Sequence, residues 1–226
     1  MLAKEFIDQD IEATTAYAAQ QDLAKSIEAN DLAHKVLDEI LAVVRPGCRE
    51  SEVKAHTYAV YEAHAVERPW HMPYIRFGAH TLLTFRDKPK EDLVLGENDI
   101  AFVDIGIVKN GVEGDAGRTI VFGEDAVLAE LAKASRDIFD EMAAYWREHD
   151  PSGEELYDEV RAAAERRGFA FNLEPAGHLI GTFPHKGWKH GLNHFPGKVE
   201  KGIWVLEIQL RHKERDCGAF YEALLY

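Results

Sequence analysis

The sequence has 226 residues, of which 46% are hydrophobic and 29% are charged, and its formal net charge at pH 7 is −14. This balance is typical of one globular domain and excludes a collagen-like or disordered chain. The negative charge repels nucleic-acid phosphates and anionic lipid, so we expect neither as a partner.

Several features point to a compact protein of the cytoplasm. The first residues carry acids and lack the apolar segment of a signal peptide. No apolar run approaches the roughly 18 residues that a membrane helix needs. We therefore expect no membrane span. The chain has no linker or sharp change in composition, and this predicts one domain over residues 1–226.

The first part of the chain has the periodicity of helices. Residues 5–29 are expected to be helical, as part of a helical N-terminal extension over 1–29. Apolar residues then recur at spacings of three and four from Leu32 to Val44, up to an Arg-Pro-Gly stop. Another helix is expected over 51–65.

The middle of the chain contains a hairpin signal. Two apolar runs, 99–108 and 112–122, flank Asn110-Gly111, and Asn-Gly between two such runs is the strongest short-range signal for a β-hairpin. Two helices are expected next, the second starting at Ser152 with the Ser and Glu spacing of a capping box.

The last third of the chain is mostly strand-like, with its clearest runs at 203–212 and 219–226. Helices are therefore followed by strands twice along the chain. This order indicates an α/β (α+β) fold with an internal duplication.

Acids lie inside the apolar strands, where burying an unpaired charge is costly. If Asn110-Gly111 forms a two-residue turn, Gly106 pairs with Asp115, and Asp104 lies on the same face as Asp115 and diagonal to it. Two carboxylates this close repel unless a proton or a cation lies between them. A divalent metal ion removes the conflict.

The same argument applies near the C-terminus. Glu207 and Glu222 lie in the two apolar runs, and the midpoint between them falls in the charged segment 212–216. An antiparallel hairpin that turns there places the two glutamates opposite each other. A single acid in a strand usually faces solvent or pairs with Lys or Arg, but four acids in matched hairpins favour metal binding.

His178 is a candidate nitrogen ligand. It is followed by Leu-Ile-Gly and preceded by Gly177, so the backbone can approach closely on both sides. Imidazole is the commonest nitrogen ligand for catalytic transition metals.

These residues together resemble the metallopeptidase family of methionine aminopeptidases, prolidases and Xaa-Pro aminopeptidases. In that family two ligand aspartates lie eleven positions apart, as Asp104 and Asp115 do here. Gly-His-Leu-Ile-Gly around His178 is similar to the family's histidine motif, and Glu207 and Glu222 match its two glutamates. Arg118-Thr119 after the second aspartate resembles the Xaa-Pro branch. The likeness runs from about residue 30 to the C-terminus.

The resemblance implies the pita-bread fold, an antiparallel-rich curved sheet flanked by helices and internally duplicated. It also implies two divalent ions (Mn, Co, Fe or Zn), with Asp115 and Glu222 bridging them, Asp104 on one ion, and His178 with Glu207 on the other. A hydroxide between the ions attacks the substrate carbonyl in such enzymes. Glu207 is then the expected general base.

Substrate contacts are expected from a further set of residues. His185 matches the family's second histidine, which contacts the substrate. The family's other substrate histidine lies eighteen residues before the first aspartate, where this chain has Arg86; an arginine can bind a carboxylate but is no proton donor at neutral pH. His80 or His71 could compensate for the missing histidine.

Three functions remain open on this basis. The first is an aminopeptidase or dipeptidase of the Xaa-Pro type that acts on small peptides. The second is a creatinase-like hydrolase or a lyase for a small molecule that carries a carboxylate, which Arg86 also fits. The third is a metal-free binding module. The resemblance also implies a homodimer.

Overall fold

The computed structural model describes residues 2–174 and 176–226; Met1 and Pro175, which belong to the predicted domain, lie outside this range. Five α-helices are found in the described residues. They are α1 (Leu2–Ala18), α2 (Leu23–Leu41), α3 (Glu50–Ala63), α4 (Ala126–His149) and α5 (Gly153–Arg166). Two 3-10 helices are η1 (Gly78–Leu82) and η2 (Leu192–His194).

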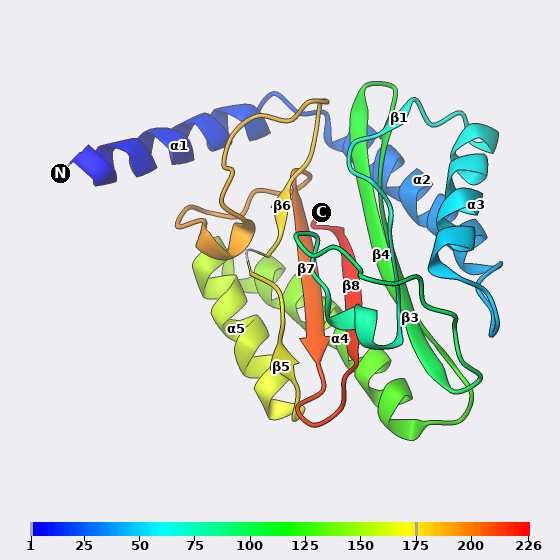
Figure 1. Ribbon diagram of the computed structural model, residues 1–226. Coiled ribbons are helices and arrows are strands. Elements are labelled where there is room, and N and C mark those ends of the chain that lie inside the picture. The colour runs from blue at the N-terminus through cyan, green and yellow to red at the C-terminus, as the bar shows by residue number, and fades with distance from the viewer. Residues whose placement is uncertain (1, 175) are drawn as a thin grey trace.

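The strands form one sheet in which every pairing is antiparallel, with the order β1-β3-β4-β8-β7-β5; in addition β2 pairs with β3 and β6 pairs with β7. The four long strands are β3 (Asp99–Lys109), β4 (Val112–Phe122), β7 (Trp204–Arg211) and β8 (Gly218–Leu224). The short strands are β1 (Arg68–Pro69), β2 (Tyr74–Phe77), β5 (Ala170–Phe171) and β6 (His178–Leu179). Figure 1 shows the two long hairpins side by side at the centre.

Helices α2 to α5 cover one face of this sheet. Apolar side chains of β3, such as Val103 and Ile105, pack in one buried cluster with α2 and α3. Leu206 and Ile208 of β7 pack in a second cluster with α4 and α5. Because successive side chains of a strand point to opposite faces, the acids that alternate with these residues point to the other face. The fold thus supplies a helix-covered apolar face and an inner face that carries polar groups.

Both predicted hairpins are confirmed, including their register. Gly106 pairs with Asp115 across the β3–β4 turn, and Glu207 pairs with Glu222 across the β7–β8 turn. The Ser152 hydroxyl and the Glu155 side chain form the expected capping box at the start of α5. Two helix–hairpin units, α2–α3 with β3–β4 and α4–α5 with β7–β8, repeat along the chain.

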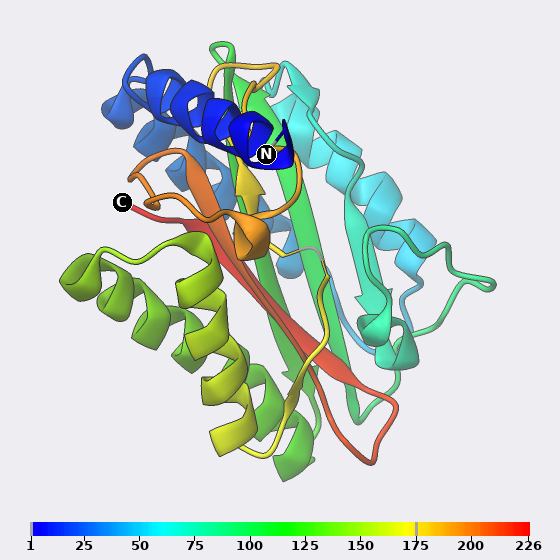
Figure 2. The same cartoon turned by 90° about the vertical axis from the view of Figure 1, so that its left-hand side faces the viewer.

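The sequence predicts a helix over residues 5–29, and this prediction is wrong in one respect: the helix is interrupted after Ala18. The chain turns between Ala18 and Leu23, because the Asp22 carboxylate accepts hydrogen bonds from the first backbone N–H groups of α2. Helix α1 therefore ends before this point and lies beside the loop that follows β6 (Figure 2). None of the helices in the described residues is long and apolar enough to cross a membrane.

Candidate metal centre

A row of residues crosses the inner face of the sheet on four neighbouring strands. Asp104 of β3 pairs with Gly117 of β4, Gly117 pairs with Glu222 of β8, and Glu222 pairs with Glu207 of β7. Paired residues on adjacent strands lie about 5 Å apart. The hairpin registers therefore bring the carboxylates of Asp104, Glu222 and Glu207 into one line. Gly117 lies in this line between Asp104 and Glu222.

Asp115 and His178 join this row from the adjacent positions. Asp115 lies two residues before Gly117 on β4 and so shares its face. The Nε2 atom of His178 lies 3.2 Å from Asp115 Oδ2 and 3.8 Å from Glu207 Oε1. The five side chains that the sequence predicts as metal ligands thus meet on one face of the sheet.

Burial makes this cluster of charges costly. Asp115 and Glu222 have 0% and 1% of their surface exposed. Both carboxylate oxygens of Asp115, Oδ1 of Asp104 and Oε1 of Glu222 are buried and accept no hydrogen bond from the described residues. The contact between His178 and Asp115 is an ion-pair contact without hydrogen-bond geometry. Buried acceptors normally have a partner. These oxygens point to a cation as the missing partner.

The pKa values follow from the same crowding. Burial raises the pKa of Glu222 well above its usual range, and the neighbouring Asp104 and Asp115 carboxylates raise it further. Burial also raises the pKa of Asp104 and of Glu207. Burial alone would lower the pKa of His178, but its contacts with Asp115 and Glu207 raise it to about 10. Without a metal ion, the cluster retains protons to limit its negative charge.

Two glycines make the approach of these groups possible. A Cβ atom at Gly117 would lie 2.6 Å from Glu222 Oε1, and one at Gly177 would lie 2.7 Å from the Tyr157 hydroxyl. Gly177 also has a φ of +68°, which side chains disfavour. Its backbone N–H donates a hydrogen bond of 2.5 Å to Glu207 Oε2.

His185 lies at the edge of the centre. Its ring is 5.8 Å from the Trp70 ring, which in turn is 5.0 Å from the His178 ring. The Glu113 carboxylate holds it: Oε2 lies 2.8 Å from His185 Nδ1, and Oε1 accepts a hydrogen bond from the His185 backbone N–H. Glu113 is buried and was not expected from the sequence, because a single acid near a turn has no distinctive pattern.

Arg86 and His80, the other predicted substrate contacts, are not brought to the centre. Arg86 is exposed and its guanidinium lies over the ring of Phe85, which lines the cavity in its place. His80 is buried against Glu50, with 2.9 Å between Nδ1 and Oε2. The position of Arg86 is set by the turn that Thr84 makes with Asp87, which directs the arginine to solvent.

A cavity of about 220 Å³ opens onto the carboxylates. It is lined by aromatic side chains, by the metal-ligand candidates, and by residues of the loop after β6. The lining includes Trp70, His71, Tyr74, Phe85, Lys189 and Gly191. The loop over 185–197 therefore contributes to the cavity.

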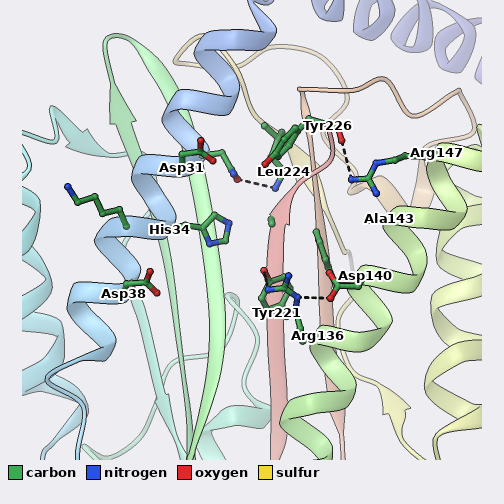
Figure 3. Close-up of a pocket in the computed structure, with 14 residues that line it drawn as sticks. Asp31, His34, Asp38, Arg136, Asp140, Ala143, Arg147, Tyr221, Leu224 and Tyr226 are labelled. Carbon is green, nitrogen blue, oxygen red and sulfur yellow. Dashed lines mark hydrogen bonds and ion pairs between the residues drawn. The ribbon is translucent and has the colours of Figure 1, made fainter.

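A larger cavity, of about 590 Å³, lies between α2, α4 and β8 on the helical side (Figure 3). Its charged groups largely satisfy one another. Arg136 donates to Asp140 and to the Tyr221 hydroxyl, and Arg147 donates to the backbone carbonyl of Tyr226. This cavity has none of the unpaired buried carboxylates that mark the inner face, so size alone does not identify the site.

Comparison with known proteins settles the family. Residues 24–225 match the model of metallopeptidase family M24. The chain belongs to metallopeptidase family M24. This is a family of metal-dependent hydrolases, and the methionine aminopeptidase of Escherichia coli is 25% identical over 174 residues, which are 74% of this chain and 65% of that enzyme. The methionine aminopeptidase of Aquifex aeolicus is 23% identical over 183 residues, 74% of this chain and 69% of that enzyme.

Solved structures give the fold. The X-Pro aminopeptidase of Thermotoga maritima superposes with a TM-score of 0.73 at 16% identity, over 97% of this chain and 60% of that one. The prolidase of Pyrococcus horikoshii has a TM-score of 0.70 at 18% identity, over 88% of this chain and 58% of that one. The predicted pita-bread fold is thereby confirmed. The chain spans less than two thirds of these prolidase and X-Pro aminopeptidase chains.

Proposed function

We propose that this protein is a metallo-aminopeptidase or dipeptidase of the Xaa-Pro type that hydrolyses small peptides with two divalent ions. The observation that carries the proposal is the set of buried carboxylate oxygens, from three strands, that face one another and lack a hydrogen-bond donor in the described residues. A dry cluster of this kind can keep its carboxylates ionised only with cations among them.

The residues present fit such ions. Carboxylate oxygens and one neutral imidazole nitrogen suit manganese, cobalt, iron and zinc, among which we favour manganese. Asp115 and Glu222 would contact both ions, Asp104 one of them, and His178 with Glu207 the other. Bound divalent ions supply Lewis acidity for a substrate carbonyl and a nucleophile at neutral pH.

The protein's own groups have separate tasks in this proposal. Glu207 accepts a proton as general base, and the N–H of Gly177 fixes the orientation of its carboxylate. His185, oriented by Glu113, contacts the substrate at the edge of the cavity. The aromatic rings of Trp70, Tyr74 and Phe85 form a wall that excludes water and packs against an apolar side chain or a proline ring.

The likeness to prolidase and X-Pro aminopeptidase structures supports the Xaa-Pro specificity only through the fold, because the identities are 18% and 16%. Arg118 does not act on the substrate in this proposal. It alternates with the inner-face residues of β4 and forms an ion pair with Asp38 of α2 on the helical side.

The test is a peptide panel assayed with the manganese- and cobalt-loaded protein. We expect hydrolysis of Xaa-Pro dipeptides or of peptides with proline in second position, with removal of activity by a chelator. Cleavage of methionine-initiated peptides alone would contradict the Xaa-Pro specificity. Absence of hydrolysis across the panel by a protein that has bound both ions would contradict the peptidase function.

The alternative of a small carboxylate substrate loses the support of Arg86, which is exposed and does not line the cavity. The metal-free binding module requires the loss of ligands, and all five predicted ligands lie together here. Homodimerisation, which the family resemblance implies, and a cytoplasmic location are further proposals. Size-exclusion chromatography with light scattering and cell fractionation test them.

A further inference from the structure

A second histidine, besides His178, faces the carboxylates. The Nε2 atom of His71 lies 3.5 Å from Asp104 Oδ1 and 3.7 Å from Asp115 Oδ1. Its side chain is 17% exposed, less than the 25% of His178. His71 lies outside the five positions that the sequence predicts as ligands.

The ring of His71 has the tautomer that a ligand requires. Its Nδ1 lies 2.8 Å from the backbone carbonyl oxygen of Met72, and because a carbonyl only accepts, Nδ1 carries the hydrogen. The lone pair of the neutral ring is therefore on Nε2, which faces the carboxylates. His178 has the same arrangement, with Nδ1 3.1 Å from the Leu179 carbonyl oxygen. Metal-binding histidines commonly donate their other N–H to such a group.

The backbone holds His71 firmly in this place. Strand β1 pairs with β3, and the Trp70 N–H donates to the Gly106 carbonyl oxygen at 3.2 Å. A Cβ atom at Gly106 would lie 2.2 Å from His71 Cδ2, so only glycine lets this segment lie flat on β3. The other face of the imidazole stacks on the Tyr74 ring, with 5.6 Å between centroids and 19° between planes.

The possible ligand atoms divide into two groups of three. His71, Asp104 and Asp115 have one ligand atom each within 4.8 Å of one another, and so do Asp115, His178 and Glu222. Asp115 is common to both groups. Each group contains one imidazole and two carboxylates, which is a balanced donor set for one divalent ion.

We propose that His71 is a sixth metal ligand, which binds the ion held by Asp104 and so gives each of the two ions its own histidine. The inference rests on the proposed two-ion function. It assigns a metal-binding role to a residue that enters the site from the irregular segment between β1 and β2.

The first experiment uses the unmodified protein loaded with cobalt alone. Ring N–H hydrogens of histidines bound to a paramagnetic ion give proton resonances far downfield, and the bonds to the carbonyls of Met72 and Leu179 protect them from exchange with water. We expect two such resonances at full cobalt occupancy. A single resonance would overturn the proposal without any variant.

The second experiment compares His71→Gln with His64→Gln in calorimetric titrations with manganese and cobalt. His64 is the matched control, because its Nε2 pairs with one carboxylate, that of Glu39 at 2.8 Å, outside the metal centre. We expect His71→Gln to weaken the binding of one ion by about a hundredfold, while His64→Gln leaves both affinities unchanged. His71→Glu, which restores a ligand atom, should recover most of that affinity; a purely packing role would not be rescued in this way.

The outcomes separate this inference from the proposed function. If the unmodified protein binds two ions and His71→Gln binds both with unchanged affinity, His71 is no ligand; a fall in kcat in that variant would then assign it to the substrate. If His71→Gln loses one ion but the loaded protein cleaves no peptide, the ligand assignment stands and the peptidase function fails. If the unmodified protein binds no ion, both fail.

Discussion

Single residues in this site depend on their neighbours more than on their own chemistry. The acids in the strands are predictable from the sequence because an acid between apolar residues needs a partner, and the hairpin signal supplies the register that pairs Glu207 with Glu222. His71 has no such pattern. Its position depends on Gly106, which lies 35 residues later and gives no hint in the sequence of what it accommodates.

Gly177 provides a residue-scale test of this packing. Gly177→Ala places a Cβ atom 2.7 Å from the Leu192 Cβ and from the Tyr157 hydroxyl at a φ of +68°. We expect the free energy of unfolding to fall by about 3 kcal/mol, from strain and overpacking together, and metal affinity to fall as Glu207 shifts. Denaturant unfolding of the metal-free protein measures the first effect.

The control is Gly168→Ala, because Gly168 has a φ of +81° and no atom within 4 Å of its Cβ position. Only the backbone strain applies there, so we expect a loss of about 1 kcal/mol and normal metal binding. Equal losses for the two variants would show that Gly177 is required for its backbone conformation alone.

Lys189 is the only lysine or arginine among the described residues that line the cavity, and we expect it to attract the carboxylate of a dipeptide. Lys189→Met should raise KM up to about fivefold for a dipeptide with a free carboxylate, the equivalent of roughly 1 kcal/mol for an exposed ion pair. The amidated dipeptide should be unaffected. Lys186→Met, in the same loop but outside the cavity lining, is the control, and an equal rise in KM for both peptides would exclude this role.

At the scale of elements, helix α1 fixes the loop that carries His185. The Gln21 side-chain oxygen, just after the helix, accepts hydrogen bonds from the Thr182 N–H at 2.8 Å and from its hydroxyl at 3.0 Å. The Trp188 N–H donates to the Thr14 hydroxyl at 3.1 Å. This connection could not be predicted, because it joins residues about 170 positions apart through polar side chains without periodicity.

Gln21→Ala should therefore loosen the loop over 182–188. We expect the free energy of local opening to fall by about 1 kcal/mol for each lost hydrogen bond, seen as faster amide hydrogen exchange in this segment. Gln20→Ala is the matched control, since the Gln20 side chain, among the described residues, bonds only to the backbone carbonyl of Ala16 in α1. Unchanged exchange in Gln21→Ala would mean that the loop is held by other contacts.

For the whole molecule, the fold class and the repeated helix–hairpin unit were predictable because hydrophobic periodicity and turn residues are local signals. The substrate wall was not. The family resemblance predicts Arg86 as a substrate contact, but the neighbouring Phe85 lines the cavity instead. Which of two adjacent residues in an irregular segment faces the cavity depends on local hydrogen bonds, such as that from the Thr84 N–H to Asp87.

The charge of the centre predicts how the stability of the metal-free protein depends on pH. The folded-state pKa values of Asp104 and Glu222 are raised by burial. Burial lowers the pKa values of His71 and His178, but the nearby carboxylates raise them more. The resulting pKa values are about 9 for His71 and about 10 for His178, against an ordinary 6.5. The folded state thus binds more protons than the unfolded state. The free energy of unfolding therefore falls as pH rises from the pH at which free carboxyl groups ionise to about 10.

Thermal unfolding of the chelated protein across this range measures the effect. Saturating manganese should remove the decline, because the ions replace the protons. Burial raises the pKa of Asp115, but its contacts with His178 and His71 lower that pKa more strongly. The stability contribution of Asp115 therefore rises with pH, but only at strongly acid pH. A Tm of the metal-free protein that rises with pH would contradict the assignment of raised pKa values.

The most direct test is a metal titration of the protein and of Asp115→Asn, with the bound metal counted by elemental analysis after dialysis. Asp115 belongs to both groups of candidate ligands, so its loss should weaken both ions at once. We predict two manganese ions per chain for the unmodified protein and fewer than one for Asp115→Asn. An unmodified protein without bound metal, or an Asp115→Asn variant that keeps both ions, would contradict a two-ion centre on this sheet.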